Sequence, residues 1–326
     1  MVLLLSRAQV QEVLTMPDAI SAVESAFGEL SAGLAVLPQR IAIRDPAPGL
    51  SLYMPAFLSQ SGALTCKVVA VYPTNPTQFD LPTTLGKILV QDPASGQVMC
   101  IMDGGFVTAV RTGAVTGVSI KYLARKDSKV VGLYGAGVQA EQQLVAACAT
   151  AAIEKCQLYD MRANIAEAFQ EKYARELGID IQLVGGDEEV WPSADIIITA
   201  STATTPLFDG NAIPEGVHIS GIGSHSPGAR ELDTAIIQRS KIVCDLTSAC
   251  LAEAGDLMIP IQEGAFSEDQ IYGELGEIVN FTKLGRQDDS EITLFKSVGL
   301  AIQDAATAKA VYDKAVAQGI GTDVDF

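Results

Sequence analysis

The sequence predicts an α/β fold, in which a Rossmann-type, doubly wound parallel sheet accompanies a mixed α+β domain. From residue 129 onward, short apolar runs alternate with helical segments, which is typical of a parallel sheet covered on both faces. Residues 38–103 contain a succession of short strands instead. At 135–140 a glycine-rich turn joins a strand directly to a helix, an arrangement that opens many doubly wound folds.

The first part of the chain starts with helix and continues with strands. Residues 7–32 are predicted to be helical, with Pro17-Asp18 opening a helix, because apolar residues recur at helical spacing. Five strands then follow, at 40–45, 50–57, 63–72, 84–92 and 96–104. The stretch QDPASGQV at 91–98 is a hairpin turn between the last two, and residues 104–125 return to helix.

The second part alternates strands and helices. Strands are predicted at 129–135, 155–160, 179–185, 194–201, 216–224 and 240–246. The helices 138–150 and 163–177 follow the first two strands, and a long helix is predicted at 297–318. The chain therefore divides into two domains, and this pattern leaves open to which of them the terminal helix belongs.

Composition and charge narrow the class of protein. The chain has 326 residues and a net charge of −17, so it lacks the basic excess that a nucleic-acid surface needs. Its N-terminal apolar run is too short for a signal peptide, and no apolar stretch reaches the length of a membrane span. We therefore expect a soluble cytoplasmic protein that binds neither nucleic acid nor membrane. The cysteines stand singly and only two histidines are present, so no metal site is predicted.

The glycine turn GAGVQA at 135–140 fits a dinucleotide site. Gly135 makes the turn, Gly137 lets the backbone approach a pyrophosphate, and Ala140 keeps helix and sheet close. The N-terminus of the next helix offers N–H groups to the phosphates. Asp160, at the end of the next strand, is placed to bind the ribose 2′-hydroxyl of NAD, whereas Arg162 could meet the 2′-phosphate of NADP. The alternative is a tight turn that binds nothing.

Three basic residues, Arg40, Lys67 and Arg111, stand in apolar or small-residue surroundings. Such side chains are rarely buried without an anion. One interpretation gives each of them its own buried salt bridge. The other gives them a shared substrate carboxylate, which arginine holds with two parallel bonds while lysine supplies a point charge and a proton. Because all three stand in the domain that accompanies the nucleotide domain, the sequence favours the carboxylate.

The two histidines have different expected roles. His225 follows a predicted parallel strand at its carboxyl end, where ligands of such sheets bind, and its ordinary pKa suits proton transfer. A histidine that only caps a loop is the alternative. His218, at the start of the same strand, is predicted to be structural.

Six short motifs, spread in order over nearly the whole chain, resemble the ornithine cyclodeaminase/mu-crystallin family. They are LPQR, LTCKVV, MDGGFVTAVRTGA, GAGVQA, ELGEI and TLFKSVGLAIQD. The family includes ornithine cyclodeaminases, NAD-dependent alanine dehydrogenases and ketimine reductases. The resemblance implies a homodimer whose substrate-binding and dimerisation domain comprises residues 1–118 with 297–326. Residues 119–296 then form the NAD(P)-binding Rossmann domain.

The resemblance also implies roles for individual residues. Arg40, Lys67 and Arg111 match residues that contact the substrate carboxylate. The segment KSVG matches one that lies near the nicotinamide. With Gly135 and Arg162 from the turn and its flank, the predicted cofactor-binding residues are Thr112, Gly135, Gly137, Val138, Gln139, Asp160, Arg162, Lys296, Ser297 and Gly299.

Two departures from the cyclodeaminase pattern bear on the activity. Leu52 stands where cyclodeaminases have a glutamate, and His225 stands where they have a catalytic aspartate. Both favour an alanine dehydrogenase or a ketimine or pyrroline-carboxylate reductase, with hydride transfer at the α-carbon of a small amino or imino acid. Lys67 would polarise the reacting group or relay its proton, and His225 is the second candidate for proton transfer. The alternatives are ornithine cyclodeaminase and a mu-crystallin-like nucleotide-binding protein without turnover.

Overall fold

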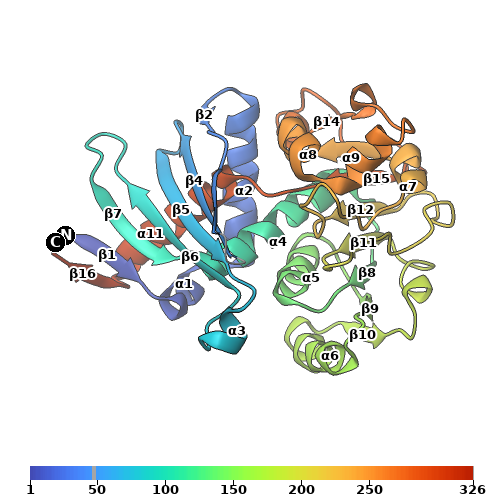
Figure 1. The fold of residues 1–326 in the computed structure, drawn as a ribbon, viewed down its shortest axis with the longest axis horizontal. Coiled ribbons are helices and arrows are strands. Elements are labelled where there is room, and N and C mark those ends of the chain that lie inside the picture. The colour runs from blue at the N-terminus through green and yellow to red at the C-terminus, as the bar shows by residue number, and fades with distance from the viewer. Residues whose placement is uncertain (46–48, 326) are drawn as a thin grey trace. The chain divides into compact units, whose positions relative to one another are not determined.

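The computed structural model describes residues 1–45 and 49–325. Its chain forms two compact units, Met1–Arg111 with Leu300–Phe326 and Thr112–Gly299 (Figure 1). Both ends of the chain belong to the first unit, where β1 (Val2–Leu5) pairs antiparallel with β16 (Thr322–Val324). In the described part of the chain, no helix combines the length and apolar character that a membrane crossing needs.

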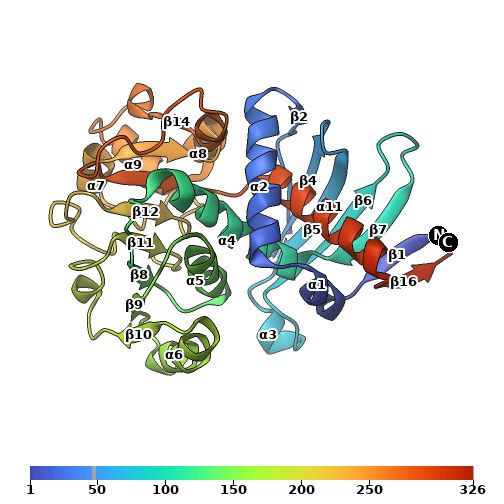
Figure 2. The ribbon, with the colours of Figure 1, turned by 180° about the vertical axis from the view of Figure 1, so that it is seen from behind.

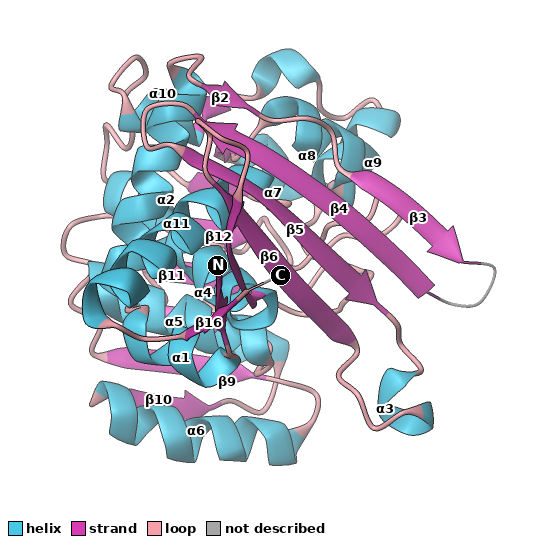
Figure 3. Ribbon diagram, turned by 90° about the vertical axis from the view of Figure 1, so that its left-hand side faces the viewer, coloured by secondary structure: helices cyan, strands magenta, loops and turns pink. Residues whose placement is uncertain are grey.

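The first unit is built on one mixed sheet of order β16-β1-β7-β6-β5-β4-β2, with β3 also pairing with β4. The five predicted strands are confirmed as β3 (Ile41–Asp45), β4 (Gly49–Leu58), β5 (Ala63–Val71), β6 (Thr84–Gln91) and β7 (Val98–Asp103). Figure 3 shows β3 to β6 side by side. The predicted hairpin joins β6 to β7, which pair antiparallel. Strands β1, β16 and the two-residue β2 (Ala35–Val36) were not predicted, because such short segments carry no clear alternation.

Helices α2 (Met16–Ser31) and α11 (Ala301–Gln318) lie over the same face of this sheet (Figure 2), and α11 packs on β4, β5 and β6. The predicted helix 7–32 is in fact two helices, because α1 (Arg7–Val13) ends before Thr15. The Thr15 side chain accepts a hydrogen bond from the backbone of Asp18 and starts α2 as an N-cap. A short helix, α3 (Asn75–Gln78), follows β5.

The second unit has a wholly parallel sheet of order β10-β9-β8-β11-β12-β15-β13-β14. The six predicted strands are confirmed as β8 (Val130–Tyr134), β9 (Lys155–Tyr159), β10 (Asp180–Leu183), β11 (Ile196–Thr199), β12 (His218–Gly221) and β13 (Lys241–Cys244). Strand β15 (Thr293–Lys296) was missed, as was β14 (Gly273–Glu274). The predicted helix 297–318 begins later, at Ala301, because residues 297–300 form a loop after β15.

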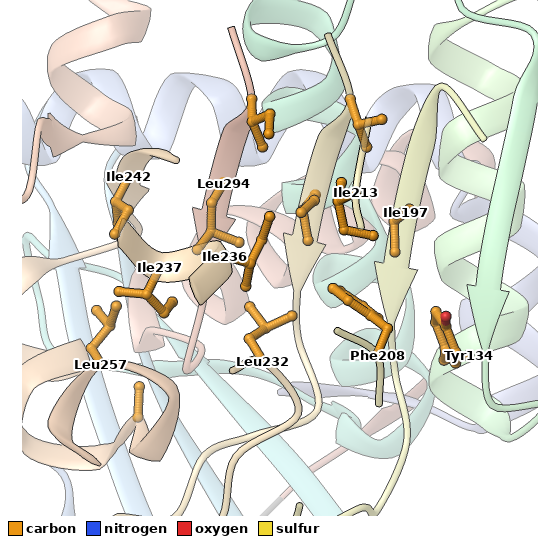
Figure 4. Packing of buried hydrophobic residues seen from close by; sticks show 14 of the residues in the cluster. Tyr134, Ile197, Phe208, Ile213, Leu232, Ile236, Ile237, Ile242, Leu257 and Leu294 are labelled. Atoms are coloured by element: carbon orange, nitrogen blue, oxygen red, sulfur yellow. The ribbon is translucent and has the colours of Figure 1, made fainter. Parts of the chain in front are cut away.

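Helices cover both faces of this sheet, which confirms the predicted doubly wound fold. On one face the later part of α4 (Gly104–Leu123), α5 (Val138–Thr150) and α6 (Ala163–Leu177) pack with Ile196 and Ile198. On the other, buried residues of α7 (Thr234–Arg239), α8 (Thr247–Glu253) and α9 (Gly255–Gln262) belong to the same core cluster as Ile197 (Figure 4). Adjacent residues of one strand point to opposite faces, so each strand serves two cores. A short helix, α10 (Leu275–Val279), follows β14.

Candidate functional site

The glycine turn between β8 and α5 has the geometry that a pyrophosphate needs. Gly135 has a φ of 99°, and a Cβ added there would lie 2.7 Å from the carbonyl oxygen of Ala200, so the position requires glycine. Gly137 is the N-cap of α5 with a φ of −86°, and a Cβ added there would meet nothing within 4 Å. Open space therefore lies beside the helix N-terminus, where N–H groups favour an anion.

Asp160 ties the end of β9 to this turn. Its Oδ2 accepts a hydrogen bond of 2.8 Å from the backbone N–H of Ala136. It also accepts bonds from the guanidinium of Arg162, at 3.0 Å from Nε to Oδ1 and 2.9 Å from Nη2 to Oδ2. The bond from the Arg162 side chain is the main cause that holds the pKa of Asp160 below its usual value. The structure thus brings together the two residues predicted to read the ribose, with Arg162 exposed and the Asp160 carboxylate mostly covered.

In the first unit, two of the three predicted cations share one carboxylate. Lys67 lies on β5, and its Nζ is 2.6 Å from Oδ2 of Asp304 in the first turn of α11. The Nε of Arg111, on α4, is 3.2 Å from Oδ1 of the same carboxylate. Arg111 also donates from Nη1 to Oε1 of Gln303. All four side chains are buried. Lys67 and Arg111 therefore each have a buried salt bridge, as the first interpretation expects, but both bridges end on the same carboxylate.

This cluster carries an excess of positive charge. Among the described residues, Asp304 is the one carboxylate within ion-pair distance of Lys67 and Arg111. Burial lowers the pKa of Lys67 to about 8, Asp304 counteracts that effect, and the charges of Arg111 and Arg40 lower the pKa further. Arg40 is half-buried and acts on Lys67 through its charge. One more anion would balance the buried cations.

Sequence reasoning missed Asp304, although it ends the quoted motif TLFKSVGLAIQD. An acidic residue in the first turn of a helix usually indicates nothing more than a favourable interaction with the helix dipole. Gln303 was missed as well, for it reads as an ordinary helical residue. No pattern in the sequence pairs either of them with a strand so far away in the chain.

The remaining predicted cofactor residues lie in the second unit. Val138 is exposed and Gln139 half-buried in the first turn of α5, whereas Thr112 is buried and its carbonyl accepts a bond of 3.0 Å from Nε2 of Gln143. Lys296 is fully buried, with Nζ 2.7 Å from Oδ2 of Asp256, and Ser297 donates to Asp245. That these residues contact a nucleotide stays a prediction. The Lys296 ammonium is already paired with Asp256.

The two histidines differ in their surroundings. His225 is exposed in the loop that follows β12, four residues beyond its end. His218 is fully buried, with its Nδ1 3.0 Å from Oγ1 of Thr293 and its Nε2 3.2 Å from the hydroxyls of Ser119 and Ser220. Burial and, to a lesser degree, the charge of Arg286 lower the pKa of His218 to about 3. His218 is thus a neutral part of the core, in agreement with the prediction.

We expect His218 to make the protein less stable in acid. An unfolded chain protonates histidine near its ordinary pKa of about 6.5, whereas the folded protein does so only near pH 3. Between these values the unfolded state binds one proton more, so the free energy of unfolding falls as the pH falls, by about 1.4 kcal/mol per pH unit. Between pH 6.5 and 5, wild type should lose about 2 kcal/mol more than His218→Gln in urea unfolding. An equal loss in both proteins would contradict this.

Comparison with known proteins gives consistent matches over the chain. The sequence model of the ornithine cyclodeaminase/mu-crystallin family matches residues 1–319. A Delta(1)-pyrroline-2-carboxylate reductase of Bacillus cereus is 36% identical over 330 residues, covering 99% of this chain and 100% of the relative. The structure of such a reductase from Thermococcus litoralis, in complex with NADH and L-proline, is 47% identical with a TM-score of 0.95, covering 99% of this chain and 100% of that one. An archaeal alanine dehydrogenase dimer with bound NAD is 34% identical with a TM-score of 0.93, covering 100% of this chain and 99% of that one.

Proposed function

Because the chain belongs to the ornithine cyclodeaminase/mu-crystallin family, we propose that it is an NAD-dependent oxidoreductase of small amino and imino acids. We further propose that its substrate is a cyclic imino acid of the pyrroline-2-carboxylate type. The observation that carries the proposal is the buried cluster in which Lys67 and Arg111 share the single carboxylate of Asp304. A substrate carboxylate supplies the missing anion, and the relative that binds NADH and L-proline supports this choice.

The residues around the glycine turn fit a dinucleotide. The backbone at Gly137 and the N-terminus of α5 would hold the pyrophosphate, and Asp160 would accept from the adenosine ribose. When bound, the dinucleotide supplies the hydride that reduces the α-carbon. The imine double bond then becomes a single bond, and its nitrogen takes up one proton.

We assign the donation of that proton to Lys67. Its pKa of about 8 lets it remain mostly protonated at neutral pH and still give up the proton readily. Its hydroxyl neighbour Thr108, 3.4 Å from Nζ, and Asp304 fix the direction of the ammonium. Arg40 and Arg111 are left to hold the substrate carboxylate. Leu52, on β4, offers no charge to a second substrate amine, which supports an imino acid over ornithine.

A spectrophotometric assay tests the proposal. Purified protein should consume NADH with pyrroline-2-carboxylate, and should produce NADH from NAD with L-proline. Pyruvate with ammonia tests the alanine dehydrogenase alternative in the same assay. Release of ammonia from L-ornithine, with no accumulation of NADH, would establish the cyclodeaminase instead. Calorimetric binding of NADH without turnover of any of these acids would leave a nucleotide-binding protein.

We expect a preference for NADH over NADPH that depends on Asp160 and Arg162. The Asp160 carboxylate accepts from a free ribose hydroxyl and repels a phosphate, whereas the exposed Arg162 can turn toward the 2′-phosphate. Arg162→Ala should therefore lower kcat/KM for NADPH about tenfold to a hundredfold, the loss of one charge-assisted bond of about 1.5–3 kcal/mol. The value for NADH should change by less than about threefold. Arg175→Ala, an exposed arginine near the end of α6, is the control. Equal losses with both nucleotides would contradict the assignment.

We also propose a homodimer, as in the archaeal alanine dehydrogenase relative. In the first unit, β2 with the residue before it, and β3, leave large apolar side chains exposed, which suits contact with a second copy. These are Leu34, Val36, Ile41 and Ile43. Sedimentation equilibrium should give a dimer for wild type and for the control Leu284→Lys, and a monomer for the double variant Ile41→Lys with Ile43→Lys. A monomeric wild type would overturn the proposal. A cytoplasmic location is part of the same proposal.

A further inference from the structure

A group of fully buried charged side chains lies in the second unit, apart from the glycine turn. It consists of Glu231, Asp256 and Lys296, and we call it the carboxylate clamp. The Glu231 Oε1 accepts bonds of 2.8 Å and 2.6 Å from the backbone N–H and the hydroxyl of Ser201. Its Oε2 accepts a bond of 2.8 Å from the backbone N–H of Gly223. One side chain therefore joins the loops that follow β11 and β12.

The other two members of the clamp hold Glu231 and the end of β12. Oδ1 of Asp256 accepts bonds of 2.7 Å and 3.0 Å from the backbone N–H groups of Glu231 and Leu232. Its Oδ2 lies 2.7 Å from Nζ of Lys296, the last residue of β15. That ammonium also donates a bond of 3.1 Å to the carbonyl oxygen of Gly221. The clamp thus connects the carboxyl ends of β11, β12 and β15.

A third buried carboxylate, Asp245, holds the loop after the next strand in the same way. Asp245 follows β13, and its Oδ2 accepts three bonds of 2.7–2.9 Å from the Ser297 hydroxyl and the backbone N–H groups of Val298 and Gly299. Its Oδ1 accepts a bond of 2.7 Å from the backbone N–H of Leu246. The loops at this edge of the sheet are therefore held by charge rather than by apolar contact alone.

A buried ion pair of this kind is a weak source of net stability. Burial raises the pKa of the Glu231 carboxyl, which expresses the cost of a charge removed from water. Buried ion pairs contribute little to net stability compared with well-packed apolar residues, although they fix geometry. The loops that the clamp fixes all leave the carboxyl ends of parallel strands, which is the edge where such sheets bind ligands.

The order of the strands tells which half of a dinucleotide these loops meet. The pyrophosphate is expected at the turn after β8, and Asp160 places the adenosine ribose at the end of β9. Strands β11, β12 and β15 lie on the opposite side of β8. The nicotinamide half must therefore extend over the loops that the clamp holds.

We infer that Glu231, supported by Asp256 and Lys296, is a positioning residue that sets the nicotinamide ring for hydride transfer through the loops at Ser201 and Gly223. The inference rests on the proposed NAD-dependent function. It assigns no contact between Glu231 and the nucleotide. If this is so, a substitution in the clamp should disturb the placement of the nicotinamide half and slow the chemical step. Binding of the adenosine half should stay unchanged.

Two substitutions disturb the clamp in different ways. Glu231→Gln replaces one acceptor oxygen with an NH2 group, which cannot accept from Ser201 or Gly223. Gly223→Ala keeps every charge, but its new Cβ would lie 2.4 Å from Oε1 of Glu231 and 2.5 Å from the carbonyl oxygen of Ser201, so it would displace the carboxylate and the loop after β11. Gly228→Ala is the matched control, because a Cβ at that position of the same loop meets nothing within 4 Å.

For both clamp variants we expect a kcat at least about tenfold below wild type and a larger kinetic isotope effect with deuterated NADH, because the ring is held less well for transfer. Calorimetry should give an ADP-ribose Kd within about twofold of wild type, since that ligand lacks nicotinamide. The fluorescence lifetime of bound NADH should change in the variants and not in Gly228→Ala.

Several results would overturn the inference. Unchanged kcat, isotope effect and NADH lifetime in folded variants would do so, as would a parallel loss of ADP-ribose affinity, which indicates general damage to the unit. Failure of both variants to fold would make the clamp a stabilising element only. Failure of the proposed function looks different, because wild type itself would then bind NADH and consume none of it with any acid. The lifetime and ADP-ribose measurements remain decisive in that case.

Discussion

Replacing Gly137 with valine is expected to raise the Kd for NADH at least about a hundredfold, or about 2.8 kcal/mol, while the protein stays folded. The φ of −86° at this position is accessible to any L-residue, and the space beside it holds no protein atom within 4 Å. The β-branched side chain would therefore fit the fold and occupy the place of the pyrophosphate. Calorimetric titration with NADH measures the affinity, and circular dichroism checks the fold.

The first glycine of the turn, Gly135, serves as the contrast. Gly135→Ala should destabilise the protein itself, because φ is 99° there and the new Cβ would lie 2.7 Å from a carbonyl oxygen. A thermal melt separates the two variants: a lowered Tm for Gly135→Ala and a nearly unchanged one for Gly137→Val. If folded Gly137→Val binds NADH as wild type does, the turn is not the pyrophosphate site.

The parallel half of the fold was the more predictable half, because its strands, turns and helices each leave a local signal. The predicted helices 138–150 and 163–177 match α5 and α6 in their bounds. Strand β15 was missed, and its Lys296 becomes an interior residue only through its pairing with Asp256. That pairing depends on the folded chain and has no counterpart in the local sequence.

The candidate site was predictable in its residue types and not in its connections. Lys67 and Arg111 stood out as charges in apolar surroundings, but Asp304 lies 237 positions from Lys67 and resembles an ordinary helix-start residue. The carboxylate clamp was missed for the same reason, because Glu231, Asp256 and Lys296 meet only when the sheet is assembled. Periodicity predicts elements, whereas ion pairs between distant elements need the tertiary structure.

Lys67→Arg is expected to lower kcat for imine reduction at least about a hundredfold, the usual contribution of a positioned general acid. Arginine keeps the positive charge opposite Asp304, so the buried ion pair and the fold should survive. A guanidinium does not give up its proton near neutral pH, so the variant loses the proton donor and keeps the charge. The KM for the imino acid should change much less than kcat, because Arg40 and Arg111 still hold its carboxylate.

The pH dependence of kcat shows whether Lys67 donates a proton or only supplies a positive charge. Lys67 has a pKa of about 8, so it is protonated below that pH and neutral above it. Reduction needs the protonated form, and wild-type kcat should fall as the pH rises through about 8; oxidation of the amino acid needs the neutral form and should rise over the same range. Lys67→Arg should show neither the fall in the rate of reduction nor the rise in the rate of oxidation over this pH range. If the variant instead keeps the wild-type kcat and profile, Lys67 only binds, the proton comes from another group, and His225→Asn becomes the experiment that locates it.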